Sequence, residues 1–259
     1  MVLLVRTREQ RMLSSIKQIA HRIGIAPYLE TPYSLVIQRP YWWMRRRFGS
    51  RPLTRTIDSV EATFVAEHAA DANYYQLDSE RLILEDLLAE VRETDVFFDV
   101  GANIGIYSCF LSQKLTEGEV IAFEPSPPAY EKLERNAAVN GGTVRQFPVA
   151  LSDVNDEVEF AVDRNDSQAQ MSTLNTATRG SDYDIRTVSA KRADDFVRER
   201  GLPLPTVVKI DVEGTEYDVL RWMTDALDAT RAKRRQVKIS ISAIIIFPWL
   251  VIMSHEYHQ

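Results

Sequence analysis

The sequence predicts an α/β fold in which a mostly parallel sheet is covered by helices on both faces. Between residues 79 and 235, short apolar segments typical of buried strands alternate with longer segments whose apolar residues have helical spacing. Glycines and acidic residues follow several of the strand-like segments, as is usual where parallel strands end. A chain of 259 residues, 45% of them hydrophobic and 26% charged, is long enough to bury such a core.

The chain divides into three zones of different character. Residues 1–78 form an N-terminal extension in which we expect helical or irregular structure, and residues 79–235 form the α/β domain. Residues 236–259 are apolar and nearly free of acidic side chains. We interpret this last zone as a divergent or truncated C-terminal segment.

The first half of the α/β domain contains two predicted strands, each followed by a helix. Residues 79–91 have apolar residues at helical spacing, and residues 96–100 are a short apolar strand. A glycine-containing turn then leads into an apolar helix that ends at residue 115. Residues 120–124 predict the second strand, and two prolines just after it open the next helix.

The second half of the domain continues the alternation. Residues 144–151 predict a third strand and residues 158–162 a fourth. Residues 193–200 predict a short helix, which ends there because a glycine follows directly. A buried strand over residues 207–211 and a helix over residues 217–227 complete the pattern.

Composition excludes several classes of protein. A formal net charge of −6 argues against a nucleic-acid partner, since nucleic-acid binders usually carry a basic surface. The single cysteine, Cys109, rules out an intramolecular disulfide. The apolar run near the N-terminus is too short for a signal peptide, and no stretch reaches the roughly 20 apolar residues of a spanning helix. We therefore expect a cytoplasmic protein.

A basic aromatic segment stands out in the N-terminal zone. From Tyr41 to Phe48 it reads Tyr-Trp-Trp-Met-Arg-Arg-Arg-Phe. Aromatic residues beside arginines suit a membrane surface, so peripheral membrane contact is one expectation for this segment. The alternative, which we favour, is that the aromatic residues pack onto the protein while the arginines stay solvated.

A polar turn follows the first predicted strand and suits a ligand with both an ammonium and a carboxylate group. Asp99 offers an acceptor for the ammonium, and the N-terminus of the next helix suits the carboxylate. Gly101 lets a ligand approach the backbone closely, and Gly105 permits tight packing where the helix begins. Together with Asn103, these residues predict a site for an amino-acid moiety.

Two further acids extend this site. Glu124 ends the second strand, where a carboxylate can accept hydrogen bonds from both hydroxyls of a ribose. Asp153 follows the third strand and is suited either to accept from the exocyclic amine of adenine or to cap a turn. Amino acid, ribose and adenine together make S-adenosyl-L-methionine. A dinucleotide site is disfavoured, because its fingerprint requires a glycine where Asn103 stands.

These motifs, in this order, resemble the FkbM family of methyltransferases. The resemblance is carried by Asp-Val-Gly-Ala-Asn-Ile-Gly at 99–105, Phe-Glu-Pro at 123–125, the stretch 136–140, Ala-Leu-Ser-Asp at 150–153 and Val-Lys-Ile-Asp-Val-Glu-Gly-Thr-Glu at 208–216. It implies a Rossmann-like class I methyltransferase fold with S-adenosylmethionine as the methyl donor. It also implies transfer to a hydroxyl group, with a hydroxylated small molecule or a glycan as the acceptor.

Two acids at the end of the strand over residues 207–211 are the predicted catalytic residues. Methyl transfer to an alcohol needs alignment of acceptor and donor, and a base for the hydroxyl proton. Asp211 and Glu213 lie two positions apart, so an extended backbone places both side chains on one side. The alternative is a structural role, in which these acids pair with Lys209 or cap the following helix.

The family pattern breaks after residue 227. The family continues with a strand containing Val-Glu, whereas residues 237–247 here contain no Asp, Glu or Asn. We therefore expect no metal site. The missing elements would normally complete the sheet and wall the acceptor pocket. Two alternatives to an active enzyme follow, a donor-binding protein with little or no turnover and a membrane-peripheral protein.

Overall fold

The computed structural model describes residues 52–67, 71, 74–77, 80–141, 143–163, 172–173, 183–212, 216–225, 228, 244–247 and 250–251. The basic aromatic segment from Tyr41 to Phe48 and the predicted catalytic residue Glu213 lie outside these residues. The fold described below belongs to one compact unit, Pro52–Ala66 together with Ala70–Gln259. Within the described part of the chain, no helix has the length and apolar character needed to cross a membrane.

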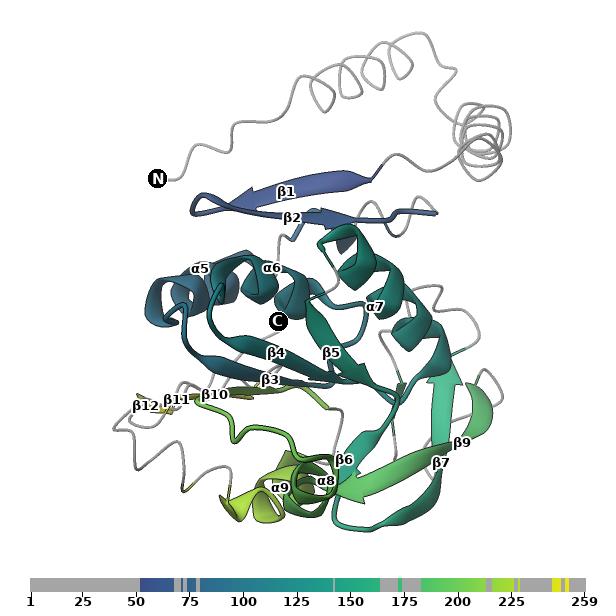
Figure 1. Cartoon of the computed structure of the whole chain (residues 1–259). Coiled ribbons are helices and arrows are strands. Elements are labelled where there is room, and N and C mark those ends of the chain that lie inside the picture. Colours follow the sequence, from purple (N-terminus) through teal and green to yellow (C-terminus); the bar gives the residue numbers. More distant parts are fainter. Residues whose placement is uncertain are drawn as a thin grey trace, which may run out of the picture. The chain divides into compact units, whose positions relative to one another are not determined.

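A six-stranded sheet forms the centre of this unit (Figure 1). Its strand order is β12–β11–β10–β3–β4–β5, and the four strands from β10 to β5 are parallel. The prediction of a mostly parallel sheet is therefore confirmed. The strands are β3 (Val96–Val100), β4 (Glu119–Phe123), β5 (Val144–Phe147), β10 (Val207–Ile210), β11 (Ile244–Phe247) and β12 (Leu250–Val251).

The apolar C-terminal segment contributes the two antiparallel strands of this sheet. Strand β11 pairs with β10, and β12 pairs with β11. Without β11, β10 would be an edge strand of the sheet. Strand β11 pairs with the main-chain N–H and C=O groups that β10 would otherwise leave unpaired along this edge. The segment therefore extends the sheet, a role that its apolar, β-branched sequence fits.

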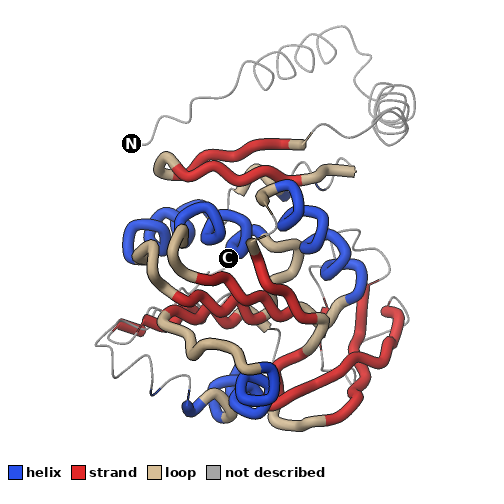
Figure 2. Tube along the Cα trace, viewed as in Figure 1, coloured by secondary structure: helices blue, strands red, loops and turns tan. Residues whose placement is uncertain are grey.

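Helices cover both faces of the sheet, as predicted (Figures 1 and 2). Helices α5, α6 and α7 lie on one face, and α8 and α9 lie on the other. Their bounds are α5 (Arg81–Glu90), α6 (Ile106–Lys114), α7 (Pro127–Val139), α8 (Ala193–Arg200) and α9 (Glu216–Arg221). The predicted end of α8 is also confirmed, since Gly201 caps it in the left-handed conformation with φ 58°.

The face toward α8 and α9 is apolar. Alternate residues of β3, β4 and β10 meet residues of both helices in one buried cluster: Phe98, Val100, Ile121, Phe123, Phe196, Val197, Val208, Ile210, Val219 and Met223. The rings of Phe98 and Phe123 pack edge to face with centroids 5.3 Å apart. Buried apolar area of this kind is the main force that holds the sheet to these helices.

The opposite face carries a row of polar side chains beneath α6. The strand register aligns Lys209 with Asp99, Asp99 with Ala122, and Ala122 with Gln146. Residues aligned in this way point to the same side of a sheet. Ser108 of α6 donates to Asp99, which fixes this side as the one that α6 covers. The chemistry-bearing residues are therefore built into this face.

A second, four-stranded sheet was not predicted. It has the order β6–β9–β7–β8, with β6 (Ala150–Ser152), β7 (Asp156–Asp163), β8 (Ser172–Thr173) and β9 (Tyr183–Arg192). The single strand predicted over residues 144–151 is wrong, because the chain leaves the main sheet at Pro148. Proline cannot donate to a ladder, and Val149 instead closes a turn by donating to the carbonyl of Phe147.

The N-terminal zone contains a β-hairpin where we expected helical or irregular structure. Strands β1 (Leu53–Ile57) and β2 (Val60–Phe64) are antiparallel and are joined by Asp58 and Ser59. Both turn residues have positive φ, 44° and 71°, which suits the twist of a two-residue hairpin. The Asp-Ser pair is a weaker hairpin signal than Asn-Gly, so the turn was not predicted from the sequence.

An asparagine of α7 and the asparagine that caps its C-terminus hold β2 and the residue after it through the main chain. The side chain of Asn140 accepts from the N–H of Thr63 and donates to its carbonyl, at 2.9 and 2.7 Å. Asn136 accepts from the N–H of Val65 at 2.9 Å and donates to the carbonyl of Ile104 at 2.8 Å. Asn136 also donates to the Tyr75 hydroxyl at 3.0 Å, so this buried amide is fully used.

Replacing Asn136 with alanine is expected to lower the free energy of unfolding by about 2 kcal/mol, because the partly buried Val65 N–H and the Ile104 carbonyl lose their partner. Chemical denaturation measures this change. The matched control is Glu134→Ala on the exposed side of the same helix, expected within about 0.5 kcal/mol of the wild type. Equal effects of the two substitutions would contradict the assigned role of Asn136.

Candidate active site

The carboxyl ends of β3, β4 and β10 bring three of the predicted site residues together. Asp99 lies within β3, Glu124 directly follows β4 and Asp211 directly follows β10. The turn after β3 is held against β4, because Gly101 and Ala102 both donate their N–H groups to the carbonyl of Phe123 at 3.0 Å. Parallel strands thus present these acids at one edge of the sheet.

The two glycines of the turn occupy positions where a side chain has no room. Gly101 has φ 73°, and an added Cβ would lie 2.0 Å from the main-chain oxygen of Asp211. Gly105 has φ 84°, and an added Cβ would lie 2.4 Å from Cδ1 of Leu133 in α7. Gly101 therefore allows the turn to pass against the loop after β10, and Gly105 allows α6 to pack closely on α7.

Asp99 is fully buried and bonded to protein groups. One carboxylate oxygen accepts from the N–H and the hydroxyl of Ser108, at 3.1 and 2.6 Å. The other accepts from Nζ of Lys209 at 2.9 Å. The predicted contact between Asp99 and a ligand ammonium remains a prediction. In this arrangement Asp99 ties β3 to α6 and to β10.

Glu124 joins the two turns that surround it. Its carboxylate accepts from the N–H of Asn103 at 2.8 Å on one oxygen and from the N–H of Ser126 at 2.7 Å on the other. A carboxylate oxygen has two acceptor positions, so each oxygen keeps one for a further donor. Two adjacent ribose hydroxyls present such a pair of donors.

The Glu124 carboxylate is also electrostatically strained. Its residue is only 5% exposed, and burial raises the pKa of this carboxyl to about 7. The two backbone N–H groups and the charge of Lys209 oppose that shift. Added hydrogen-bond donors stabilise the charged form of a carboxylate. Ligand hydroxyls would therefore stabilise the charged form of Glu124 by adding hydrogen bonds that the described protein groups do not supply.

Buried polar atoms without partners among the described residues mark the same place. They are Asn103 Oδ1, Ser126 Oγ and Gln146 Oε1. Ser126 precedes α7, but its hydroxyl makes no capping bond, and Pro127 and Pro128 have no N–H to offer. Atoms of this kind are costly to bury alone, so a ligand with both donors and acceptors fits them. The residues around Glu124 thus fit a nucleoside.

Asp153 lies in a different setting from the other predicted residues. It is exposed and follows β6, which belongs to the second sheet. Its carboxylate is 3.2 Å from the hydroxyl of Ser152, and its main-chain oxygen accepts from Nε of Arg192 at 2.8 Å. An adenine contact for Asp153 remains a prediction.

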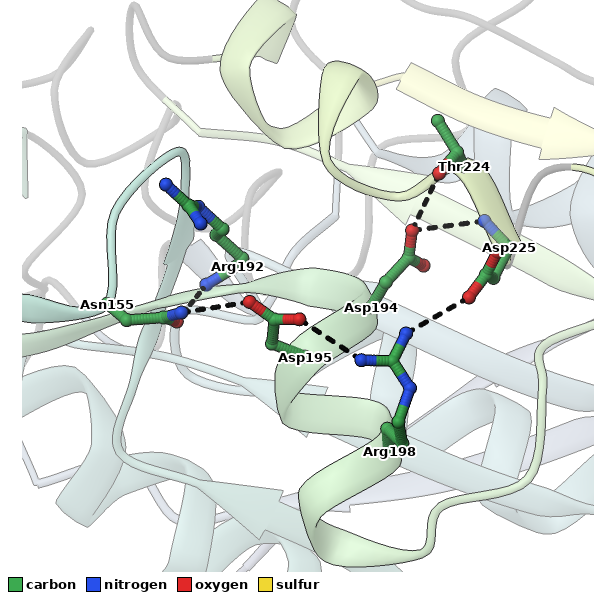
Figure 3. A network of polar contacts seen from close by, with 7 residues as sticks. All are labelled: Asn155, Arg192, Asp194, Asp195, Arg198, Thr224 and Asp225. Atoms are coloured by element: carbon green, nitrogen blue, oxygen red, sulfur yellow. Dashed lines mark hydrogen bonds and ion pairs between the residues drawn. The ribbon is translucent and has the colours of Figure 1, made fainter.

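A polar network stabilises the region beside Asp153. Figure 3 shows it linking the β6–β7 turn to α8 and to the chain after α9 through Asn155, Arg192, Asp194, Asp195, Arg198, Thr224 and Asp225. The guanidinium of Arg192 also lies 4.2 Å from the ring centroid of Trp222. Arg192 therefore connects the Asp153 turn with the chain that follows α9.

Asp211 is the predicted catalytic residue that the structure describes. Its carboxylate is 3.7 Å from Nζ of Lys209, which agrees with the structural pairing that we considered as the alternative. Burial raises the pKa of Asp211 to about 6, Lys209 opposes this shift, and the charges of Glu80 and Asp99 add to it. The side chain is 42% exposed, so solvent screens these charges in part.

Three residues beside Asp211 were not predicted to belong to the site. Lys209 is buried, and its Nζ lies 4.9 Å from the ring centroid of Tyr107. The Tyr107 hydroxyl donates to the carboxylate of Glu80, which precedes α5. Lys209 could have been found, since an apolar strand seldom carries a lysine without a buried partner. Glu80 had no such signal.

Among the described residues, no group of three or more histidine, cysteine, aspartate and glutamate side chains is placed to hold a metal ion. The charged groups near Asp211 instead form a mixed cluster of carboxylates and one lysine. This arrangement supplies proton acceptors next to a fixed positive charge. It suits chemistry in which a hydroxyl proton must be removed near neutral pH.

Comparisons with known proteins place this chain in one family. The profile of the Methyltransferase FkbM domain matches residues 99–255. The chain is 33% identical over 190 residues to the hexuronic acid methyltransferase AglP of Haloferax volcanii, covering 72% of this chain and 75% of AglP. It is 29% identical to 31-O-demethyl-FK506 methyltransferase FkbM of Streptomyces tacrolimicus, covering 64% and 74% of the two chains. It is also 29% identical to the 2-O-methyltransferase NoeI of Sinorhizobium fredii, covering 52% and 60%.

Replacing Gly101 with alanine tests the close approach of the turn to Asp211. We expect the free energy of unfolding to fall by about 3 kcal/mol, because backbone strain and the 2.0 Å overlap add. Gly201→Ala is the matched control, since Gly201 also has positive φ but no described atom lies within 4 Å of the added carbon. Denaturation should show a loss of only about 1 kcal/mol for the control. Equal losses would mean that the overlap is relieved without cost.

Proposed function

Because the chain belongs to the FkbM methyltransferase family, we propose that this methyltransferase uses S-adenosylmethionine to methylate a hydroxyl group of a glycan or a small hydroxylated metabolite. The observation that carries the proposal is the Glu124 carboxylate, which keeps two acceptor positions open at the end of β4. The names of the relatives support the acceptor class, since they include a hexuronic acid methyltransferase and a 2-O-methyltransferase.

The proposed donor supplies a methyl group on a sulfonium, which is transferred by in-line displacement. Glu124 would accept the ribose hydroxyls, and the unpartnered oxygens of Asn103 and Ser126 would take part in the same contact. The turn over residues 101–105 would receive the amino-acid portion, because α6 begins there and the N–H groups of its first turn suit a carboxylate. Asp153 would contact adenine, as predicted from the sequence.

The acceptor hydroxyl would be oriented beside the loop after β10. Asp211 is partly exposed there, and burial raises its pKa toward the range in which a carboxylate removes a proton effectively. Glu213, two positions further along the sequence, remains our second proposed catalytic residue. Alignment of the hydroxyl supplies much of the rate enhancement in such a reaction, and the base supplies the rest.

The proposed function predicts that the protein binds the methyl donor. We expect calorimetric titration with S-adenosylhomocysteine to give micromolar affinity that strengthens as the pH rises through about 7, because the charged form of Glu124 is the better acceptor. In Glu124→Gln, both the affinity and its pH dependence should be lost, whereas Glu159→Gln on exposed β7 should behave as wild type. Binding by Glu124→Gln equal to that of the wild type would exclude the proposed ribose contact.

Turnover is the second prediction. Asp211→Asn and Glu213→Gln should each lower kcat for methyl transfer by about 100-fold or more, with S-adenosylhomocysteine affinity nearly unchanged, because a lost base affects the transition state and not donor binding. Transfer of a labelled methyl group to a panel of glycans and hydroxylated metabolites measures kcat. Loss of donor binding in Glu213→Gln would instead place Glu213 in the donor site. Donor binding without transfer to any acceptor would favour a binding protein without turnover.

A further inference from the structure

Lys209 is a buried cation that contacts both halves of the candidate site. Its residue is 2% exposed, and its ammonium group donates to Asp99 at 2.9 Å and to the carbonyl of Gly101 at 3.0 Å. These two contacts belong to the turn that would receive the donor. The same ammonium lies 3.7 Å from the carboxylate of Asp211, the proposed base. The charge of Lys209 therefore contacts both the turn proposed to bind the donor and the carboxylate proposed to act on the acceptor.

We propose that Lys209 is a positioning residue that fixes the donor turn and at the same time keeps Asp211 ionised for its work on the acceptor. This inference rests on the proposed function, because it gives Asp211 the role of base. It assigns no contact between Lys209 and either substrate. Lys209 acts through Asp99, Gly101 and Asp211.

The geometry makes Lys209 the counter-charge of a crowded carboxylate cluster. Asp99 faces it from β3, Asp211 from the loop after β10, and Glu80 from the residue before α5. Tyr107 of α6 presents its ring to the ammonium and its hydroxyl to Glu80. Burial alone would favour the neutral amine, but the carboxylates raise the pKa of Lys209 above its usual value. The lysine therefore stays charged throughout the neutral range.

Lys209 and Glu80 act on Asp211 in opposite directions. Lys209 lowers the pKa of Asp211, whereas the negative charge of Glu80 raises it. Removing the lysine would leave Asp211 among carboxylates, so Asp211 would bind a proton at higher pH. Removing the charge of Glu80 would have the reverse effect. A purely structural role for Lys209 predicts no such pair of opposite shifts.

The test is a direct titration of Asp211 in the full chain by carbon NMR of labelled aspartate carboxyl groups, with the signal assigned from Asp211→Asn. We expect Lys209→Met to raise the pKa of Asp211 by about one pH unit or more, and Glu80→Gln to lower it. Lys209→Arg should restore most of the wild-type value, because it keeps the charge. Lys191→Met on β9 is the matched control and should leave the titration unchanged.

The pH dependence of kcat provides the kinetic half of the test. Its acid limb should move to higher pH in Lys209→Met and to lower pH in Glu80→Gln, in step with the titration. Should Lys209→Met fail to fold because Asp99 is left unpaired, the double variant Lys209→Met/Asp99→Asn decides, since it removes both charges of the buried pair and its comparison with Asp99→Asn isolates the charge of Lys209. An Asp211 pKa that loss of the Lys209 charge leaves unchanged or lowers overturns the inference.

The two proposals fail in different ways. Opposite shifts of the Asp211 titration in a protein that transfers no methyl group would retain the role of Lys209 and reject the proposed function. Methyl transfer with an Asp211 titration that neither variant moves would retain the function and reject the role of Lys209.

Discussion

The buried pair of Lys209 and Asp99 is the interaction on which the rest of this structure depends. It joins β10 to β3 on the face that α6 covers, and Ser108 ties the same carboxylate to α6. A buried charge without its partner is strongly destabilising, so removing either member alone lowers the stability of the fold. The contacts of this pair thus link β10, β3, α6 and the turn that begins at Gly101.

Much of the fold could be predicted because local signals and tertiary structure agree. The strand over residues 96–100 and the helix over residues 193–200 have the predicted bounds. A short apolar run marked the strand, and the glycine at position 201 marked the end of the helix. Agreement was lost where pairing partners decide. Residues 158–162 do form a strand, but β7 pairs antiparallel in a second sheet, and the sequence of a strand does not name its neighbour.

The candidate site was predictable to the extent that its residues share one motif. Asp99 lies near the end of β3, and Gly101 and Glu124 directly follow β3 and β4, so the topology of a parallel sheet brings them together. Glu80 and Tyr107 reach the same place from helices, and nothing in their local sequence relates them to Asp211. Prediction from motifs therefore recovers the groups at strand ends better than the charges that tune them.

The contact between α7 and the hairpin constrains the sequence on the helix side more than on the strand side. Asn136 and Asn140 bind the main chain of β2 and the residue after it, so the side chains at Thr63 and Val65 are not what α7 recognises. The side chains at positions 63 and 65 are thus less constrained by this contact than the two asparagines, whereas Ala62 and Phe64 of β2 remain buried in the core. Proline is the residue that neither position can accept, because each must keep an N–H to donate. Across relatives, the conserved record of this contact would lie in the helix and not in the strand.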